Sequence, residues 1–175
     1  IIRDSDRAAP LGTGTFKVGG NYAASLRGTI KSQQAGYGAP MYLDCCEKKY
    51  IDEIGAANFF AIKDNTYITP KSSSILASIT NMSLITLAED LGYKVERRPV
   101  SVDELESFEE VGACGTAAVI SPIGEVIDIE SGKVYKFCKD CKAGPVSKKL
   151  YDTLVGIQYG DIEDKHGWVT IIDKD

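Results

Sequence analysis

The sequence predicts a mixed α/β fold in a single domain. Short runs rich in β-branched and aromatic residues are separated by turn residues, which is typical of strands. Longer segments carry apolar residues at helical spacing and are followed by glycine. The length of 175 residues is ample for one hydrophobic core, and the sequence has no internal repeat or low-complexity tract.

The first half of the chain predicts a helix followed by a meander of strands. A helix is expected over 21–35, where Tyr22, Leu26 and Ile30 recur at helical spacing. An Asp-Asn pair at 64–65 predicts a turn between two of the strands. The apolar runs bounded by turn residues predict strands at 41–44, 50–54, 58–63 and 67–69.

The next segment predicts a second helix, a strand and a short helix. Apolar residues at helical spacing predict a helix over about 80–91, and Gly92 follows its end. A strand is expected through Val95. Ser101 and Glu104 have the spacing of a capping box, which predicts the start of the short helix.

The C-terminal part continues this alternation of elements. A helix is expected over 145–155, because Pro145 stands where the first turn tolerates proline and Gly156 stands where a helix commonly ends. The remaining apolar runs predict strands around 117–120, 126–129, 134–137 and 168–172.

Composition and charge argue against several classes of partner. The formal net charge of −5 argues against a nucleic-acid surface. No apolar run approaches the length of a membrane span, and no segment has the layout of a signal peptide. The cysteine count of five is odd and fits a reducing compartment better than a disulfide framework. We therefore expect a cytoplasmic protein without nucleic-acid or membrane partners.

The cysteines and the histidine do not predict a metal site. Cys138 and Cys141 have Cys-x-x-Cys spacing, but a structural zinc site usually needs four ligands. The adjacent Cys45 and Cys46 are a poor second pair. The single histidine, His166, lies in a polar stretch where solvent is its simplest partner. We therefore expect no metal.

Lys17 is the most informative single residue, since glycines and small residues flank it in Gly12-Thr-Gly-Thr-Phe-Lys17-Val-Gly-Gly-Asn-Tyr22. Glycine lets the backbone pass close to another group, and small side chains leave room for a planar molecule. A lysine in a partly desolvated pocket has its ammonium form disfavoured, so its amine can condense with an aldehyde. The alternative interpretation is a surface lysine in a glycine-rich turn.

Three further segments carry groups that suit a binding site. Glu53 lies between apolar neighbours, where a buried carboxylate needs a basic partner or a protonated ring nitrogen; the alternative is an exposed glutamate at a strand end. The helix start at 78–80 offers amides to a phosphate, or ordinary capping by Ser78 or Thr80. The small residues at 112–118 predict a turn with further amides for an anion.

Seven blocks of the chain, taken in order, resemble the C-terminal, cofactor-binding domain of the branched-chain amino acid aminotransferases, which are pyridoxal-phosphate enzymes of fold type IV. The resemblance covers nearly the whole chain and favours the site interpretation over the alternatives above. The blocks are Asp6-Arg7-Ala8, Lys17-Val-Gly-Gly-Asn-Tyr22, Glu53-Ile-Gly-Ala-Ala-Asn-Phe-Phe60, Ser74-Ile-Leu-Ala-Ser-Ile-Thr80, Cys114-Gly-Thr-Ala117, Gly144-Pro-Val-Ser-Lys-Lys-Leu150 and Gly156-Ile-Gln-Tyr-Gly-Asp161.

The resemblance implies a role for individual residues around pyridoxal 5′-phosphate. Lys17 would bind the cofactor aldehyde as a Schiff base and then move the proton of the reaction as general base and acid. Glu53 would hydrogen-bond the pyridine nitrogen and keep it protonated, and Tyr22 would contact the ring hydroxyl. Arg7 matches an arginine that family members have near the cofactor.

The resemblance also implies two anion sites. Ile79 and Thr80 would give backbone amides, and Thr80 its hydroxyl, to the cofactor phosphate. Thr116 and Ala117 would present amides to the substrate carboxylate. One departure is that this chain has Leu-Ala-Ser at 76–78, where many members have Leu-Pro-Gly.

Family members carry a preceding domain of comparable size, whereas this chain starts at Ile1, midway through the family pattern. We therefore expect residues 1–175 to be the C-terminal pyridoxal-phosphate-binding domain alone. A pocket lined by one domain is open to water, so weak cofactor affinity and negligible turnover are expected of this fragment. The resemblance also implies a homodimer in the complete enzyme.

The implied reaction transfers the amino group of leucine, isoleucine or valine to 2-oxoglutarate in two half-reactions on one cofactor. Two alternatives share the fold, a D-amino acid aminotransferase and an aminodeoxychorismate lyase. A further alternative is a non-catalytic remnant that serves as a structural or partner-binding domain. The joint presence of Lys17, Tyr22 and Glu53 argues against a remnant.

Overall fold

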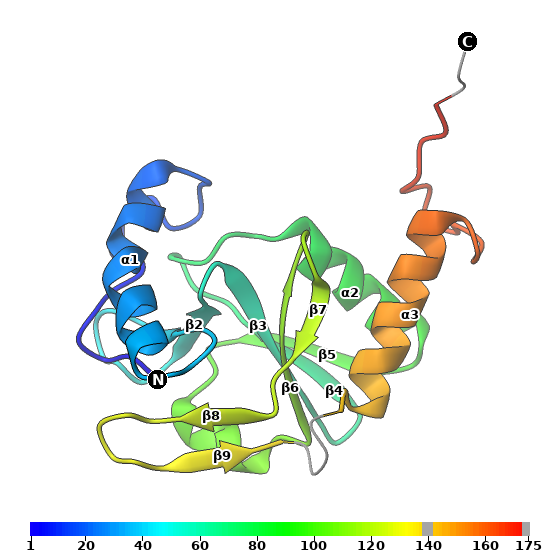
Figure 1. Ribbon diagram of the computed structural model, residues 1–175. Helices are drawn as coiled ribbons and strands as arrows, with labels where there is room; N and C mark the ends of the chain where they lie inside the picture. Colours follow the sequence, from blue (N-terminus) through cyan, green and yellow to red (C-terminus); the bar gives the residue numbers. More distant parts are fainter. Residues whose placement is uncertain (138–141, 173–175) are drawn as a thin grey trace.

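A mixed sheet forms the centre of the molecule, with helices on both sides (Figure 1). The computed structural model describes residues 1–137 and 142–172; within them seven strands form this sheet and two more form a separate hairpin. The helices are α1 (Gly19–Gln34), α2 (Ile79–Asp90), the 3-10 helix η1 (Val102–Ser107) and α3 (Pro145–Tyr159). The strands are β1 (Met41–Leu43), β2 (Ile51–Ile54), β3 (Ala57–Lys63), β4 (Thr66–Pro70), β5 (Lys94–Arg98), β6 (Glu110–Gly115), β7 (Val119–Pro122), β8 (Glu125–Ile127) and β9 (Val134–Lys136).

The sheet branches at β3. The order along the main path is β1-β2-β3-β4-β5, and β6 pairs with both β3 and β7. Because β6 pairs along most of β3, β2 and β4 share the other edge, with β2 at the start of β3 and β4 at its end. β4 and β5 are parallel and are connected through α2, as expected for parallel neighbours. The predicted mixed α/β class is confirmed.

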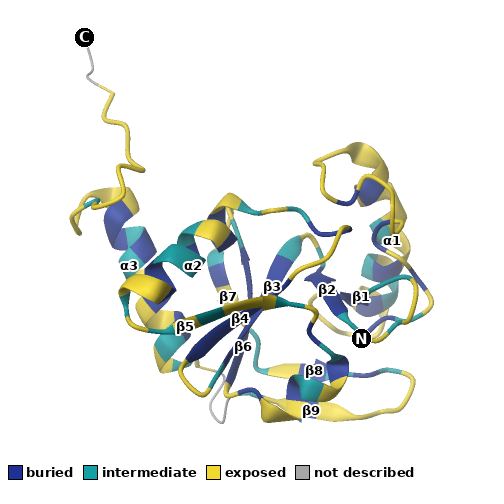
Figure 2. Cartoon of the chain, turned by 180° about the vertical axis from the view of Figure 1, so that it is seen from behind, coloured by how far each residue is buried: buried dark blue, intermediate teal, exposed yellow. Residues whose placement is uncertain are grey.

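β3 separates two hydrophobic cores. Phe59 and Ala61 face the first core, which η1 and the β8–β9 hairpin help to close. Phe60 and Ile62 face the second, which α2 and α3 cover. This alternation follows from the side-chain period of a strand. Figure 2 shows the buried strands in the interior and the exposed outer faces of the helices.

The predicted first helix is confirmed as α1, but its apolar positions do not pack into a core. Tyr22, Leu26 and Ile30 are 46%, 57% and 50% exposed. The helix lies at the end of the molecule away from α2 and α3 (Figure 1). The physical reason is that the buried positions of α1 are small or polar residues, which are Asn21, Gly28 and Ser32.

Gly28 is a close contact between α1 and the sheet. A Cβ atom at this position would lie 2.5 Å from Tyr42 Oη and 2.8 Å from its Cε1. The Tyr42 hydroxyl also donates to the carbonyl of Ser25 at 2.6 Å. We expect Gly28→Ala to lower the free energy of unfolding in urea by about 1–3 kcal/mol, because the added methyl overpacks this contact.

The matched control is Gly20→Ala in the first turn of α1, where a Cβ would meet nothing within 4 Å. This variant is expected to leave stability unchanged or to raise it slightly, since alanine is the better helix former. Equal losses of unfolding free energy in the two variants would contradict a close packing contact at Gly28.

Two local predictions are confirmed in detail. Asp64 and Asn65 have φ angles of 47° and 58°, the left-handed values that a tight two-residue hairpin requires. Ser101 and Glu104 form the predicted capping box at the start of η1: the amide of Ser101 donates to Glu104 Oε1 at 2.9 Å, and Ser101 Oγ accepts from the amide of Asp103 at 3.2 Å.

The predicted turn at 112–118 is wrong in its first half. Residues 112–115 belong to β6, which lies between β3 and β7, and only 116–118 form the turn. The small residues serve close packing instead of a turn, since a Cβ at Gly112 would lie 2.4 Å from the ring of Phe60. A strand of small residues is stabilised by its two neighbours, which local sequence does not reveal.

The C-terminal predictions need two corrections. α3 runs through Gly156 and ends at Gly160, which has a φ of 80°. The chain then folds back, and the amides of Asp161 and Ile162 donate to the carbonyl of Gly156 at 2.8 and 3.0 Å. The predicted strand at 168–172 is absent from the described structure, because this segment runs away from the sheet (Figure 1).

The Cys138 and Cys141 pair lies outside the described residues. Within the described residues, no helix is long and apolar enough to cross a membrane.

Candidate active site

A shallow cavity beside the start of α1 brings together Arg7, Lys17, Tyr22 and Glu53. Lys17 lies in the loop before α1, Tyr22 in its first turn and Glu53 in β2. Leu76 and the turn between β2 and β3 complete the wall. The cavity holds about 30 Å³, which is too small to enclose a molecule the size of a cofactor. Four of the predicted site residues therefore meet in one place.

Lys17 itself is exposed, which corrects the partly desolvated pocket predicted from its small neighbours. Phe16 and Tyr22, which line the same cavity, are exposed as well. Glycines at this position leave space beside the lysine but do not by themselves remove water from it.

Asn21 fixes the loop that carries Lys17. Its side-chain amide donates to the carbonyls of Thr13 and Phe16 at 2.8 and 2.9 Å, and its Oδ1 accepts from Thr13 Oγ1 at 2.9 Å. Sequence reasoning assigned no role to Asn21. The only signal in the sequence was an asparagine directly after two glycines, at the start of the predicted helix. Its burial, which requires hydrogen-bond partners, is seen only in the structure.

Glu53 is 4% exposed, and both of its carboxylate oxygens have partners. Oε2 lies 3.2 Å from Nε of Arg7, and Oε1 accepts from the amide of Leu76 at 3.1 Å. Burial raises the pKa of Glu53 from 4.5 to about 7, although the Arg7 charge and the Leu76 amide act in the opposite direction. Of the two partners considered for this carboxylate, the chain itself supplies the basic side chain.

The raised pKa of Glu53 predicts a pH dependence of stability. The folded state binds the Glu53 proton more tightly than the unfolded chain, so this contribution is fully present below pH 4.5 and is lost as the pH rises through about 7. We expect the unfolding free energy of the parent chain to fall between pH 5 and 7.5 by about 2 kcal/mol more than that of Glu53→Gln. Parallel urea titrations check this, and equal slopes in both proteins would contradict the burial argument.

The predicted phosphate residues lie at the start of α2. Ser78 is the N-cap, and its Oγ accepts from the amide of Asn81 at 3.2 Å. The amides of Ile79 and Thr80 precede the first hydrogen bonds within the helix and are free to bind an anion. Ile79 is 73% exposed and Thr80 is buried. Neither residue lines the cavity of Lys17.

The predicted carboxylate residues, Thr116 and Ala117, lie in the exposed turn between β6 and β7. Glu53 pairs with Asn58 across β2 and β3, and Asn58 pairs with Cys114 across β3 and β6. This row of three residues brings the turn to the same sheet edge as the cavity. Thr116 and Ala117 do not line the cavity itself.

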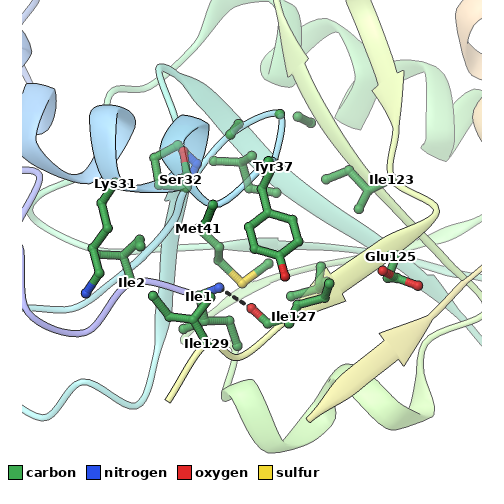
Figure 3. Close-up of a pocket in the computed structure, with 18 of the residues that line it drawn as sticks. Ile1, Ile2, Lys31, Ser32, Tyr37, Met41, Ile123, Glu125, Ile127 and Ile129 are labelled. Atoms are coloured by element: carbon green, nitrogen blue, oxygen red, sulfur yellow. Dashed lines mark hydrogen bonds between the residues drawn. The ribbon is translucent and has the colours of Figure 1, made fainter. Parts of the chain in front are cut away.

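A larger cavity of about 520 Å³ lies between the C-terminal end of α1, the start of the chain and the β8 hairpin strand (Figure 3). Its walls are mainly apolar, with Ile1, Met41 and Ile127 among them, and Tyr37 reaches across it. None of the predicted site residues lines it. Four of the predicted site residues therefore line the smaller of the two cavities, and none lines the larger one.

The smaller site has the groups that amine chemistry on an aldehyde cofactor requires. A lysine amine can bind the aldehyde, and a buried carboxylate can pair with a protonated ring nitrogen. The cavity therefore has a donor set that fits an aldehyde cofactor with a ring nitrogen. Residues 1–126 match the family model of the class IV amino-transferases, and the chain belongs to this family.

Individual relatives are more specific. The chain is 48% identical over 180 residues to the branched-chain-amino-acid aminotransferase of Haemophilus influenzae. The aligned region covers 99% of this chain and 52% of the relative. The chain is 49% identical over 166 residues to the Helicobacter pylori enzyme of the same name, with 94% and 47% covered. The chain therefore spans about half the length of the curated relatives it matches.

Solved structures confirm the fold. The branched-chain amino acid aminotransferase of Escherichia coli matches with a TM-score of 0.83 at 34% identity, covering 95% of this chain and 53% of that one. The T.th. enzyme of the same name, solved with pyridoxamine 5′-phosphate, also gives 0.83, at 31% identity and with 96% and 52% covered. The predicted fold type IV architecture is confirmed.

Proposed function

We propose that this chain is the cofactor-binding part of a branched-chain amino acid aminotransferase. The enzyme would transfer the amino group of leucine, isoleucine or valine to 2-oxoglutarate. One observation carries the proposal: the buried Arg7–Glu53 pair opens onto the same cavity as Lys17 and Tyr22, in a chain whose relatives bear this name.

The donor set fits pyridoxal 5′-phosphate. Glu53 is a buried carboxylate with one cationic partner, Lys17 is a free amine at the mouth of the cavity, and the start of α2 offers amides for a phosphate. Relatives in this fold have been solved with pyridoxamine and phosphopyridoxyl ligands. When bound, the cofactor supplies an aldehyde that links to amines and a ring that stabilises a carbanion.

Each residue of this chain then has a defined task. Nζ of Lys17 would bind the cofactor aldehyde at rest, and would afterwards carry a proton from the substrate α-carbon to the cofactor carbon as general base and acid. The Glu53 carboxylate, paired with Arg7, would hold a proton at the ring nitrogen, and the Tyr22 hydroxyl would hydrogen-bond the ring oxygen.

Two anion sites complete the assignment. The amides of Ile79 and Thr80, with the Thr80 hydroxyl, would bind the phosphate, and the amides of Thr116 and Ala117 would bind the substrate carboxylate. The carboxylate site lies at the sheet edge that the Glu53 row defines. The proposal includes no metal.

We also propose that residues 1–175 form a C-terminal domain and that a further domain covers the open face of the site. The exposed Lys17 and the shallow cavity support this, because a transferred proton and a reactive carbonyl need protection from water. The relatives' additional length supplies enough chain for such a domain. A cytoplasmic homodimer is part of the same proposal.

A substrate panel on the full-length protein tests the function. With 2-oxoglutarate as acceptor, we expect glutamate to form from L-leucine, L-isoleucine and L-valine with kcat/KM at least about 10-fold above that for D-alanine or L-aspartate. Preference for D-alanine would favour the D-amino acid alternative. Absence of transfer from every amino acid, by protein that has bound the cofactor, would favour a remnant domain.

A further inference from the structure

A second buried carboxylate stands directly behind the proposed site. Asp52 precedes Glu53 in β2 and is 4% exposed. Its Oδ2 accepts from Oγ of Ser74 at 2.7 Å, whereas its Oδ1 is buried without a hydrogen-bond partner among the described residues. The function proposed above gives Asp52 no task, and burying a carboxylate is costly.

Ser74 connects Asp52 to Arg7. Its hydroxyl donates to Asp52, and its backbone carbonyl accepts from Nη2 of Arg7. Ser72 shares a hydrogen bond with the Ser74 hydroxyl at 2.8 Å. A continuous series of contacts therefore runs from Asp52 through Ser74 and Arg7 to Glu53. Glu53 is the residue that we propose as the partner of the ring nitrogen.

The charges in this series do not balance. Asp52 and Glu53 are two buried carboxylates, and Arg7 is the guanidinium that acts on both. Burial raises the pKa of both carboxyls, the Arg7 charge opposes this on each of them, and the Asp52 charge raises the pKa of Glu53 further. When both carboxyls are ionised, this series carries one net negative charge, which a protonated ring nitrogen would balance.

We propose that Asp52 is a positioning residue that holds Arg7 through Ser74 and offsets the guanidinium charge, so that the potential at Glu53 favours a protonated ring nitrogen. The role of Asp52 toward a ring nitrogen rests on the proposed function, whereas its effect on the pKa of Glu53 does not. Other groups also face Glu53 and stay unchanged in the test. The titratable groups around Glu53 are Arg7, Lys17, Tyr22, Asp52 and Cys114.

The test uses the chain without cofactor and follows the Glu53 carboxyl carbon by NMR as the pH is raised, with Glu53→Gln to assign the signal. Asp52→Asn removes a negative charge near Glu53 and leaves Arg7 to that carboxylate alone. Both effects favour the ionised form of Glu53. We expect its titration midpoint to fall by about one pH unit in Asp52→Asn.

Ser74→Ala is the second variant, since it removes the hydroxyl that supports Asp52 and retains the backbone contact to Arg7. We expect a smaller fall of the midpoint in this variant. Ser73→Ala is the control, because it breaks a hydrogen bond from the same loop to the carbonyl of Pro10 without touching Asp52. The control is expected to leave the midpoint unchanged.

An unchanged midpoint in Asp52→Asn, even with lowered thermal stability, would overturn the proposal and leave Asp52 a purely structural role. If Asp52→Asn does not fold, Ser74→Ala decides alone: a fall supports the proposal and an unchanged midpoint overturns it. Cofactor labelling of Lys17 reads the proposed function separately, so failure of one account is distinguishable from failure of the other.

Discussion

Replacing Lys17 with alanine is expected to abolish covalent attachment of pyridoxal phosphate. The parent chain, mixed with excess cofactor and reduced with borohydride, should retain the pyridoxyl group after denaturation and dialysis, measured as a mass increase of the protein. Lys17→Ala should lose this label, because no other lysine of the described residues lines the cavity that also contains Glu53 and Tyr22. In the full-length enzyme, we expect the same change to lower amino-group transfer by at least about 10²–10⁴-fold.

Lys71→Ala is the matched control for non-specific labelling. Lys71 is exposed and lies outside the cavity, but it is close in sequence to the Ser74 loop. Its removal should leave the label in place. Equal labelling of the parent and Lys17→Ala would contradict the assignment of Lys17.

Arg7→Leu is expected to give a large loss of stability. The substitution removes the guanidinium that pairs with Glu53, and breaking a buried ion pair by removing one partner typically costs about 3–5 kcal/mol. The loss should be smaller at pH 5 than at pH 7.5, because Glu53, with a pKa of about 7, is protonated at the lower pH and needs no partner. Urea unfolding at both pH values measures this.

Arg27→Leu is the control for loss of a guanidinium as such. The Arg27 side chain is 74% exposed and lies 3.8 Å from Asp4, so its pairing is a surface contact worth little. We expect its effect on unfolding to stay below about 1 kcal/mol at either pH. Comparable losses in the two arginine variants would show that burial of the Arg7–Glu53 pair does not decide stability.

Much of the fold could be predicted where local sequence dictates it. The Asp64–Asn65 turn and the capping box of Ser101 and Glu104 depend on a few adjacent residues, and both are present as predicted. β6 could not be predicted in this way, because Gly112 and its small neighbours form a strand only between β3 and β7. The exposure of the apolar side chains of α1 could not be predicted either, since helical periodicity does not say which face of a helix is covered.

The candidate site also combines features that local sequence determines with features that only the tertiary fold determines. The sequence predicted that Glu53 needs a basic partner, and its type and apolar neighbours were enough for that inference. The pairing with Arg7 and the contact to Leu76 depend on the tertiary fold, and no local pattern indicates them. The contact between Asp52 and Ser74 could not be predicted for the same reason, because each is an ordinary polar residue until the 72–76 loop packs beside β2.

The most direct test of the central claim is to locate the cofactor on the chain. Protein incubated with pyridoxal phosphate, reduced with borohydride and digested should carry the pyridoxyl group on the peptide that contains Lys17. The account predicts one modified lysine at low cofactor excess. A label on another lysine, or one spread evenly over the exposed lysines, would contradict it.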